Sequence, residues 1–406
     1  MAFCNPEHCC PPPAVKACWV AATPYYQKPG HGAGLSAPPT DLEQLVRSKF
    51  TVKEFFVLPE GELEFQVAYG ADTKEKFVHL EREVGAMGYR PELTGTQDEC
   101  VLLVRKVTTQ PGGRSRTPVL MALLTFASLQ VFSFLQASVD VQLVPGFPTY
   151  LLFLGFDATV GVLLVVHELG QRLAARKGQA GHSNSYVIPG VPILTPFLPS
   201  LGFVNTQREP AVNKDRLFDV AIAGPLAIFV FAVILYVIGV LSSTPSTVAF
   251  QNTQLVNSTV SINPNAVQTG LNYLLGPLVP SAPAGSVLVS PIADGASFGF
   301  ILVFIGLLPM ALFDGGLMAS AAWGDRAARG TTYLSVLLLL VLDMNYATYW
   351  AVAIVALLLA GRPVRLRLQD EVSGLSRSRQ YVFIGSLVLA FLCLPVPHSI
   401  ATFPLP

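Results

Sequence analysis

The chain has 406 residues, of which 51% are hydrophobic and 13% are charged, and its formal net charge is zero. This composition excludes an ordinary soluble globular protein, because so apolar a surface needs a solvent other than water. A neutral chain has no global positive field, so we expect no nucleic acid as a partner.

The N-terminal third divides into an extension and a small folded unit. Residues 1–39 carry eight prolines and no hydrophobic periodicity, which is typical of a disordered segment or an upstream extension. Residues 40–107 are predicted to form a small α+β domain. "TDLE" at Thr40 and "DTKE" at Asp72 indicate capped helices, the run Leu63–Tyr69 alternates as a half-buried strand does, and "ECVLLVRKV" predicts a closing strand.

Apolar runs dominate residues 118–397 and predict a membrane domain. We expect spans near 118–138, 147–168, 217–241, 291–313, 331–342, 347–361 and 381–397. The polar stretch 242–290 is predicted to be an external loop. Lys and Arg gather on alternate connections, and this bias places the N-terminal domain in the cytoplasm. The predicted fold is therefore a polytopic α-helical membrane protein of about seven spans with a small N-terminal α+β cytoplasmic domain.

The stretch "VVHELGQRLAARKG" lies at the end of the second predicted span. In a His-Glu-x-x-His motif, a helix carries two imidazoles one turn apart, where both reach one zinc ion, and the Glu acts as the base for the metal-bound water. Here His167 and Glu168 fit the motif, but Gln171 occupies the position of the second histidine. The sequence predicts a metalloprotease-like site with one ligand missing.

Two further stretches belong with this motif. "LLPMALFDGG" places Asp314 at the end of the fourth predicted span, at the depth where a third zinc ligand is needed, with Pro309 able to kink that span. "VIPGVPILTPFLPSLGF" is apolar, but its prolines exclude a helix. We expect an extended or re-entrant element beside the site, offering backbone edges to an unwound substrate strand.

These motifs together resemble the site-2 protease family of intramembrane zinc metalloproteases, with the greatest likeness to its plant EGY branch and archaeal relatives. The likeness also includes "TQREPAVNKDRLFDVAIAGPLA" and "DEVSGLSRSR". It implies zinc as cofactor, His167 and Asp314 as metal ligands and Glu168 as the general base. It further implies a substrate-binding role near Pro309 and at Gly306, where the family often has an asparagine.

Three functions follow as hypotheses. The first expected function is a non-catalytic or impaired relative that binds transmembrane segments, since Gln171 is a much poorer zinc ligand than histidine. The alternatives are an active intramembrane zinc endopeptidase cutting near the cytoplasmic face, and an ion-coupled transporter using Asp157, Glu168 and Asp314. The expected partners are transmembrane substrates or clients and the lipid bilayer, in a cell membrane or, for a plant protein, a thylakoid or plastid membrane.

Three other residues are candidates for the missing metal ligand, and none of them is favoured. His182 could fold back toward it, although a loop histidine is the simpler interpretation. Asp157 lies ten residues before His167, about 15 Å along the helix, and is too deep to join it. Asp219 is predicted to pack at the entry of the third span instead.

Overall fold

The computed structural model describes residues 40–58, 61–107, 116–178, 183–191, 195, 198–207, 209–245, 264–279, 288–342, 349–360 and 367–394. The predicted extension 1–39, the alternative ligand His182, and much of the loop predicted at 242–290 lie outside these ranges.

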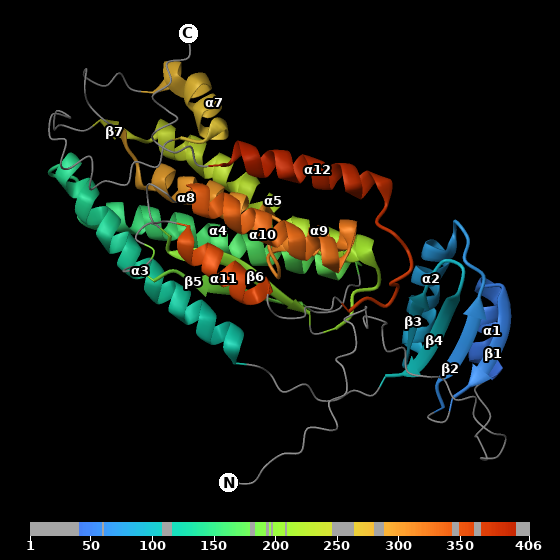
Figure 1. Ribbon diagram of the computed structural model, residues 1–406. Coiled ribbons are helices and arrows are strands. Elements are labelled where there is room, and N and C mark those ends of the chain that lie inside the picture. Colours follow the sequence, from blue (N-terminus) through green and yellow to red (C-terminus); the bar gives the residue numbers. More distant parts are fainter. Residues whose placement is uncertain are drawn as a thin grey trace, which may run out of the picture. The chain divides into compact units, whose positions relative to one another are not determined.

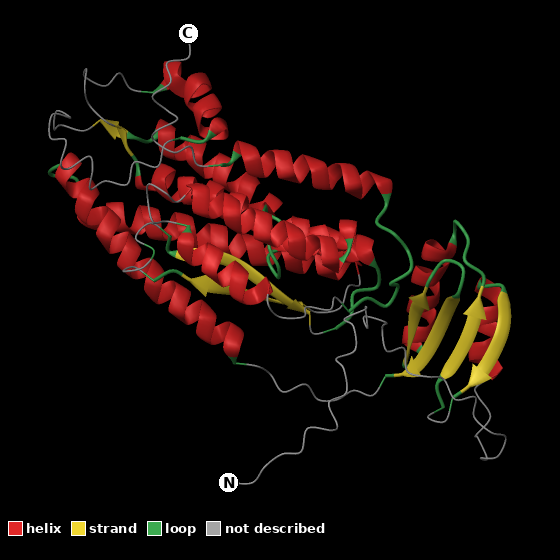
Figure 2. Cartoon of the chain, viewed as in Figure 1, coloured by secondary structure: helices red, strands yellow, loops and turns green. Residues whose placement is uncertain are grey.

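Residues 40–106 form a four-stranded antiparallel sheet with two helices (Figure 2). The order along the chain is α1 Thr40–Lys49, β1 Val52–Val57, β2 Leu63–Val67, α2 Thr73–Ala86, β3 Tyr89–Gly95 and β4 Cys100–Lys106. In the sheet the strands run β1-β2-β4-β3. Phe65 and Leu102 from the sheet pack with Phe77 and Leu80 of α2, and all four side chains are fully buried. Burial of these rings and aliphatic chains is the main stabilising contribution to this unit.

Two expectations for this region need correction. The strand β3 was not predicted, because Pro91 and its polar neighbours obscure the alternation, yet β3 pairs with β4 along its whole length. Asp72 is the N-cap residue of α2, but its carboxylate makes no capping hydrogen bond. That carboxylate instead pairs with Lys76 at 2.7 Å, one helical turn away.

Among the described residues, three helices are long and apolar enough to cross a membrane: α3 Thr117–Leu143, α4 Thr149–Gly178 and α5 Lys214–Leu241. They correspond to the first three predicted spans. Further helices are α8 Pro291–Leu307, α9 Asp314–Trp323, α10 Asp325–Leu342, α11 Trp350–Ala360 and α12 Arg377–Leu392. The buried faces of α4, α5 and α8 form one continuous apolar core, and the outer faces of α4 and α5 carry exposed Leu, Val, Ile and Phe side chains. This distribution is that of helices solvated by lipid.

The fourth predicted span, 291–313, is wrong in its last six residues. The helix α8 ends at Leu307, and Leu308 is extended with ψ 135°. A residue that precedes proline is driven out of the helical region, so Pro309 terminates the helix instead of kinking it. Asp314 consequently begins a new helix, α9, and does not end α8.

Both ends of the Pro-rich stretch after α4, residues 187–189 and 200–203, are extended, as the sequence predicts, whereas residues 192–194 and 196–197 lie outside the described ranges. The two ends belong to an antiparallel hairpin of β5 Ser183–Pro189 and β6 Ser200–Gln207. The Ser128 hydroxyl of α3 donates to the Gly190 carbonyl at 2.7 Å and holds the hairpin against that helix. Within 242–290, the described residues include α7 Ala266–Leu275, the short turn η1 Gly276–Leu278, and the paired two-residue strands β7 Thr244–Pro245 and β8 Leu288–Val289.

A strap of residues 367–376 connects the sheet to the start of α5. On one side, Leu93 of β3 donates its N–H to the Gln369 carbonyl at 2.6 Å and accepts from Glu371 at 3.0 Å. On the other side, Ala211 donates to the Arg367 carbonyl at 3.0 Å and accepts from Gln369 at 2.8 Å. The strap thus supplies backbone partners to both neighbours at once.

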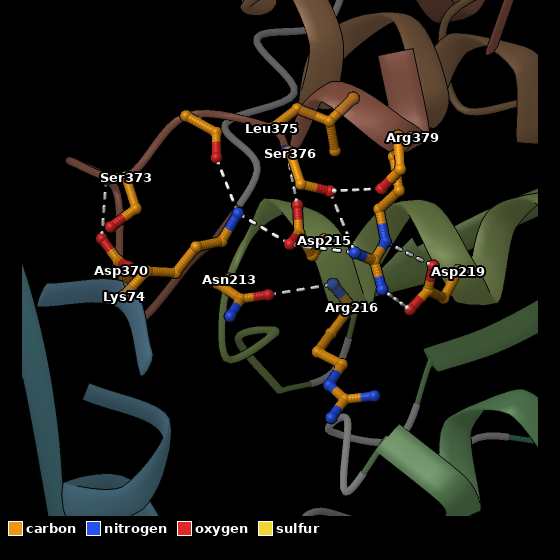
Figure 3. A network of polar contacts seen from close by, with 12 residues as sticks. Lys74, Asn213, Asp215, Arg216, Asp219, Asp370, Ser373, Leu375, Ser376 and Arg379 are labelled. Carbon is orange, nitrogen blue, oxygen red and sulfur yellow. Dashed lines mark hydrogen bonds and ion pairs between the residues drawn. The ribbon is translucent and has the colours of Figure 1, made fainter. Parts of the chain in front are cut away.

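Charged side chains reinforce this junction (Figure 3). Lys74 of α2 lies 2.7 Å from Asp215 of α5 and also donates to the Gly374 carbonyl at 2.8 Å. Arg379 of α12 makes two hydrogen bonds of 2.7 Å to Asp219 and one of 3.1 Å to Asp215. Two parallel bonds between a guanidinium and a carboxylate fix both direction and distance.

We expect Arg379→Gln to lower the free energy of unfolding by about 1–3 kcal/mol, because it leaves the half-buried Asp219 without its bidentate partner. The matched control is Arg47→Gln, which removes an exposed pair with Glu43 one turn away in α1 and is expected to change stability by less than about 1 kcal/mol. Thermal unfolding of the detergent-solubilised chain measures both. Equal melting temperatures for the two variants would contradict a structural role for Arg379.

Stability at high pH should depend on Cys100 of β4. Burial, assisted by the nearby Asp370 carboxylate, raises the pKa of this thiol from 9.0 to about 11. A raised pKa means that the folded state favours the neutral thiol, so its contribution is complete below pH 9 and is lost as the pH rises to about 11. The difference in unfolding free energy between the wild type and Cys100→Ala should therefore shrink across that interval.

Candidate functional site

The helix α4 presents His167 and Gln171 on one face, one turn apart, as the motif spacing predicts. Both side chains are buried, with 1% and 4% of their surface exposed. They face Asp314, the first residue of α9, which is fully buried. The structure thus brings Asp314 into contact with two residues that precede it by 147 and 143 positions.

The Asp314 carboxylate is the centre of the site. His167 Nε2 lies 2.8 Å from its Oδ2, and Gln171 Nε2 donates to its Oδ1 at 2.6 Å. A third donor, the Asn205 amide of β6, also bonds to Oδ1. A buried carboxylate without partners would be very unfavourable, and these three N–H groups satisfy it.

Backbone geometry explains how Asp314 reaches this position. The loop 308–313 folds back on the start of α9, with Leu312 at a φ of 65°. A Cβ on Gly315 would lie 2.2 Å from the Leu308 carbonyl oxygen, and one on Gly316 would lie 1.8 Å from the Met310 carbonyl oxygen. Only glycine fits at either place. The same loop accepts the Asn205 N–H at the Leu312 carbonyl, 2.8 Å away, so β6 is aligned with it.

The imidazole of His167 is enclosed by two other elements. The Phe203 ring of β6 stacks on it, with centroids 3.5 Å apart and planes inclined by 12°. On the α5 side, a Cβ added to Gly224 would lie 2.4 Å from His167 Nε2. The absence of a side chain at Gly224 is therefore what makes room for the ring.

The hydrogen-bond pattern fixes the orientation of each donor. Asp314 accepts only, so Gln171 and Asn205 must direct their NH₂ groups at it and their oxygens away. Those two amide oxygens and His167 Nδ1 are buried and make no hydrogen bond within the described part of the chain. An unpaired ring acceptor is less unfavourable than an unpaired N–H, so we assign the proton to Nε2, which then donates to Asp314.

Glu168 does not belong to this cluster. Its side chain is 31% exposed and pairs with Arg172 of the same helix at 2.7 Å. A helix separates adjacent residues by about 100°, which directs Glu168 away from the face that carries His167. The expected base and the expected ligand are therefore engaged with different partners.

The donors present do not fit a catalytic zinc ion. Such a site needs three protein ligands drawn from imidazole, thiolate and carboxylate. Among the described residues no group of three His, Cys, Asp or Glu side chains could hold a metal. His167 and Asp314 contribute two, and the remaining neighbours are the amides of Gln171 and Asn205. The 2.8 Å between Nε2 and Oδ2 is a direct hydrogen bond.

The two residues with an expected substrate-binding role lie on either side of the α8 terminus. Gly306 is buried, and a Cβ there would be 3.9 Å from Asp314 Oδ2 and 3.5 Å from Pro225. Pro309 is partly buried in the loop, and its carbonyl accepts from Thr331 of α10 at 3.3 Å. Gly306 thus borders the cluster, whereas Pro309 serves the packing of the loop.

Other acidic candidates have partners of their own. Asp157 of α4 accepts from Gln130 at 2.6 Å and Ser133 at 3.2 Å, both on α3. Asp219 pairs with Arg379 near the start of α5, which agrees with its predicted packing at the entry of the third span. Asn205 and Phe203 were not predicted. Their spacing by two residues in "GFVNTQ" puts both on one face of a strand, but the sequence carries no signal that sets Asn205 apart.

Long apolar helices around a buried histidine–aspartate contact define a helical membrane protein with an ionisable site inside its helical core. Residues 155–342, which include His167 and Asp314, match the model of the family described as Peptidase family M50. The matched segment, a little under half of the chain, is a Peptidase family M50 (site-2 protease) domain.

Curated relatives are plant proteins. The chain is 30% identical over 247 residues to "Probable zinc metalloprotease EGY2, chloroplastic" of Arabidopsis thaliana, an alignment that covers 59% of this chain and 41% of the relative. It is 27% identical to the EGY2 protein of Oryza sativa subsp. indica, covering 73% and 53% respectively. It is 26% identical to "Probable zinc metalloprotease EGY3, chloroplastic" of the same rice, covering 83% and 57%. The chain thus spans about half the length of these relatives. No solved structure matches it.

Substitution of Gly224 tests the packing around His167. We expect Gly224→Ala to lower the melting temperature by several degrees, because the new methyl group would overlap the imidazole and force it from Asp314. The control is Gly161→Ala in α4, where an added Cβ meets nothing within 4 Å. That change should be neutral or stabilising by up to about 1 kcal/mol, since alanine favours helix. A tolerated Gly224→Ala would contradict the close approach of α5 to the ring.

Proposed function

We propose that this chain is a membrane protein of the site-2 protease family that binds transmembrane segments without hydrolysing them. One observation carries the proposal. The group that completes the ring of contacts on Asp314, next to His167, is the Gln171 amide and not a second imidazole. The names of the relatives, which are described as chloroplastic, support a plastid membrane as its location.

The amide changes what the site can do. In a metal centre, Asp314 and His167 would direct their lone pairs at an ion. Here the carboxylate instead accepts N–H groups from His167, Gln171 and Asn205, which link α4, β6 and α9 directly. These hydrogen bonds give the cluster its cohesion without an ion, and each charge-assisted bond contributes about 1.5–3 kcal/mol.

Glu168 supports the same interpretation. A general base must lie within hydrogen-bond reach of the water that it activates. Glu168 is paired with Arg172 and directed away from the cluster. Even with a metal bound, Glu168 would first have to release Arg172 and turn toward His167.

The hairpin β5–β6 is the proposed contact for a client segment. Its two strands form a sheet of their own in the part of the chain that the structure describes, and β6 carries Phe203 and Asn205 into the His167–Asp314 cluster. An extended segment that added to the β5 edge would gain main-chain hydrogen bonds that bulk lipid cannot offer. The proposed partners are accordingly transmembrane proteins, with the bilayer as solvent.

An active zinc endopeptidase is the second candidate, favoured by the names of the relatives, which are called probable zinc metalloproteases. It would cut transmembrane helices near their cytoplasmic ends. An ion-coupled transporter has less support. Asp157, Glu168 and Asp314 each bond to a separate set of side chains, and such a distribution does not line up a path for ions.

Metal analysis distinguishes these candidates. We expect the detergent-purified chain, exposed to zinc and then dialysed, to retain far less than one equivalent by mass spectrometry. Gln171→His should raise zinc retention at least tenfold, because a third imidazole or carboxylate ligand is then present. The double variant Gln171→His/Asp314→Ala serves as its control and should lose that gain.

The opposite outcome is equally definite. If the wild type retains close to one equivalent of zinc, and Asp314→Ala releases it whereas Glu168→Gln does not, the site binds metal as it stands and the proposal of a non-hydrolysing protein is wrong.

A further inference from the structure

The helix α7, between α5 and α8 in the chain, is held to both by polar side chains. Tyr236 of α5 donates its hydroxyl to Asn272 at 2.9 Å, and Gln268 donates to Ser297 of α8 at 2.7 Å. A capping box formed by Asn265 and Gln268 starts the helix. Val267 and Leu271 pack against the core of the helical part. The helix α7 is therefore packed against α5 and α8.

The two residues that bind α7, Tyr236 and Ser297, lie inside the ends of their helices and not at the termini. Tyr236 precedes the end of α5 at Leu241 by five residues, and Ser297 follows the start of α8 at Pro291 by six. At 1.5 Å per residue these positions are about 7–9 Å inside the helix ends. From Val220 to Leu241 the helix α5 has no charged residue, so this stretch is the part that crosses the hydrocarbon. The depth of α7 is thus that of the boundary between headgroups and acyl chains.

The outward face of α7 and η1 is apolar (Figure 1 shows α7 beside the end of α5). Tyr273 is 85% exposed, Leu274 69% and Leu278 68%. The exposed Thr269 donates its hydroxyl to the Asn265 carbonyl of the same turn. The side chains that bond to the bundle are amides, whereas the large exposed side chains are hydrocarbon and aromatic. A surface helix in water has the opposite arrangement.

From these observations we infer that α7 and η1 form an interfacial element that inserts Tyr273, Leu274 and Leu278 into the lipid at this end of the bundle. The helix α5, to which α7 is bonded, also exposes Ile234, Ile238 and Leu241. The whole stretch 242–290 carries no charged side chain, so no charge draws α7 into the aqueous phase. Tyrosine, with an apolar ring and a polar tip, is favoured at such a boundary.

Photo-crosslinking tests the insertion of α7 into lipid. The photo-reactive residue p-benzoyl-phenylalanine is placed at position 274 of the full chain in phosphatidylcholine nanodiscs. We expect illumination to attach lipid at 274 with at least half the yield found at position 230, since Val230 is an exposed residue of the spanning helix α5. The negative control is position 79, because His79 is exposed on α2 of the sheet unit. Peptide mass spectrometry identifies the adducts, and lipid attachment at 79 should be at background.

Two results would overturn the inference. If lipid attachment at 274 is at background while position 230 is labelled efficiently, the exposed face of α7 lies in water. Adducts joining 274 to a second copy of the chain in place of lipid would make it a dimer surface. Leu274→Gln gives an independent measurement: it should weaken the protection of α7 amides from hydrogen exchange in nanodiscs, and Thr269→Gln on the same helix should not.

Discussion

The buried carboxylate of Asp314 is the constraint around which the helical part is arranged. An anion with no exposed surface must be surrounded by donors, and here they come from α4 and from β6. That requirement explains features that look unrelated in the sequence. The two glycines after Asp314 let the loop fold over it, Gly224 clears space for the imidazole, and the hairpin turns Asn205 inward. Because the donors lie on α4 and β6 and the carboxylate lies on α9, the carboxylate also acts as a cross-link among these three elements.

Much of this arrangement follows from local patterns that a sequence displays. The apolar runs predict α3, α4 and α5, the prolines of "VIPGVP" predict extended backbone, and the i, i+4 spacing brings His167 and Gln171 onto one face. These are short-range rules, and they depend on the chain geometry alone. The depth of Asp314 relative to His167 also follows, because both sit near the ends of apolar segments.

The remaining features depend on contacts between distant residues. From the sequence, Pro309 could either kink a helix or end it. In the structure α8 ends before Pro309, and the loop that follows packs on the start of α9. Asn205 has no signature of its own, since an asparagine near the end of a strand is ordinary until Asp314 is placed beside it. Likewise the strap 367–376 offers few apolar residues, and its position is set by backbone bonds to Leu93 and Ala211. The pairing of Glu168 with Arg172 is different, because it follows from the i, i+4 spacing on one helix.

Glutamine and histidine at position 171 share the capacity to donate a hydrogen bond but differ as metal ligands. Both can donate an N–H to Asp314, so either is compatible with the cross-link between α4 and α9. Only histidine adds a lone pair with high affinity for zinc. Asn205 then imposes a second condition, because its amide bonds to the same Oδ1 atom as Gln171 does. A metal that approached Asp314 would have to displace the His167 hydrogen bond at Oδ2 or the amide bonds at Oδ1. The carboxylate can accept three N–H donors or coordinate one divalent ion, and Gln171 and Asn205 together favour the donors.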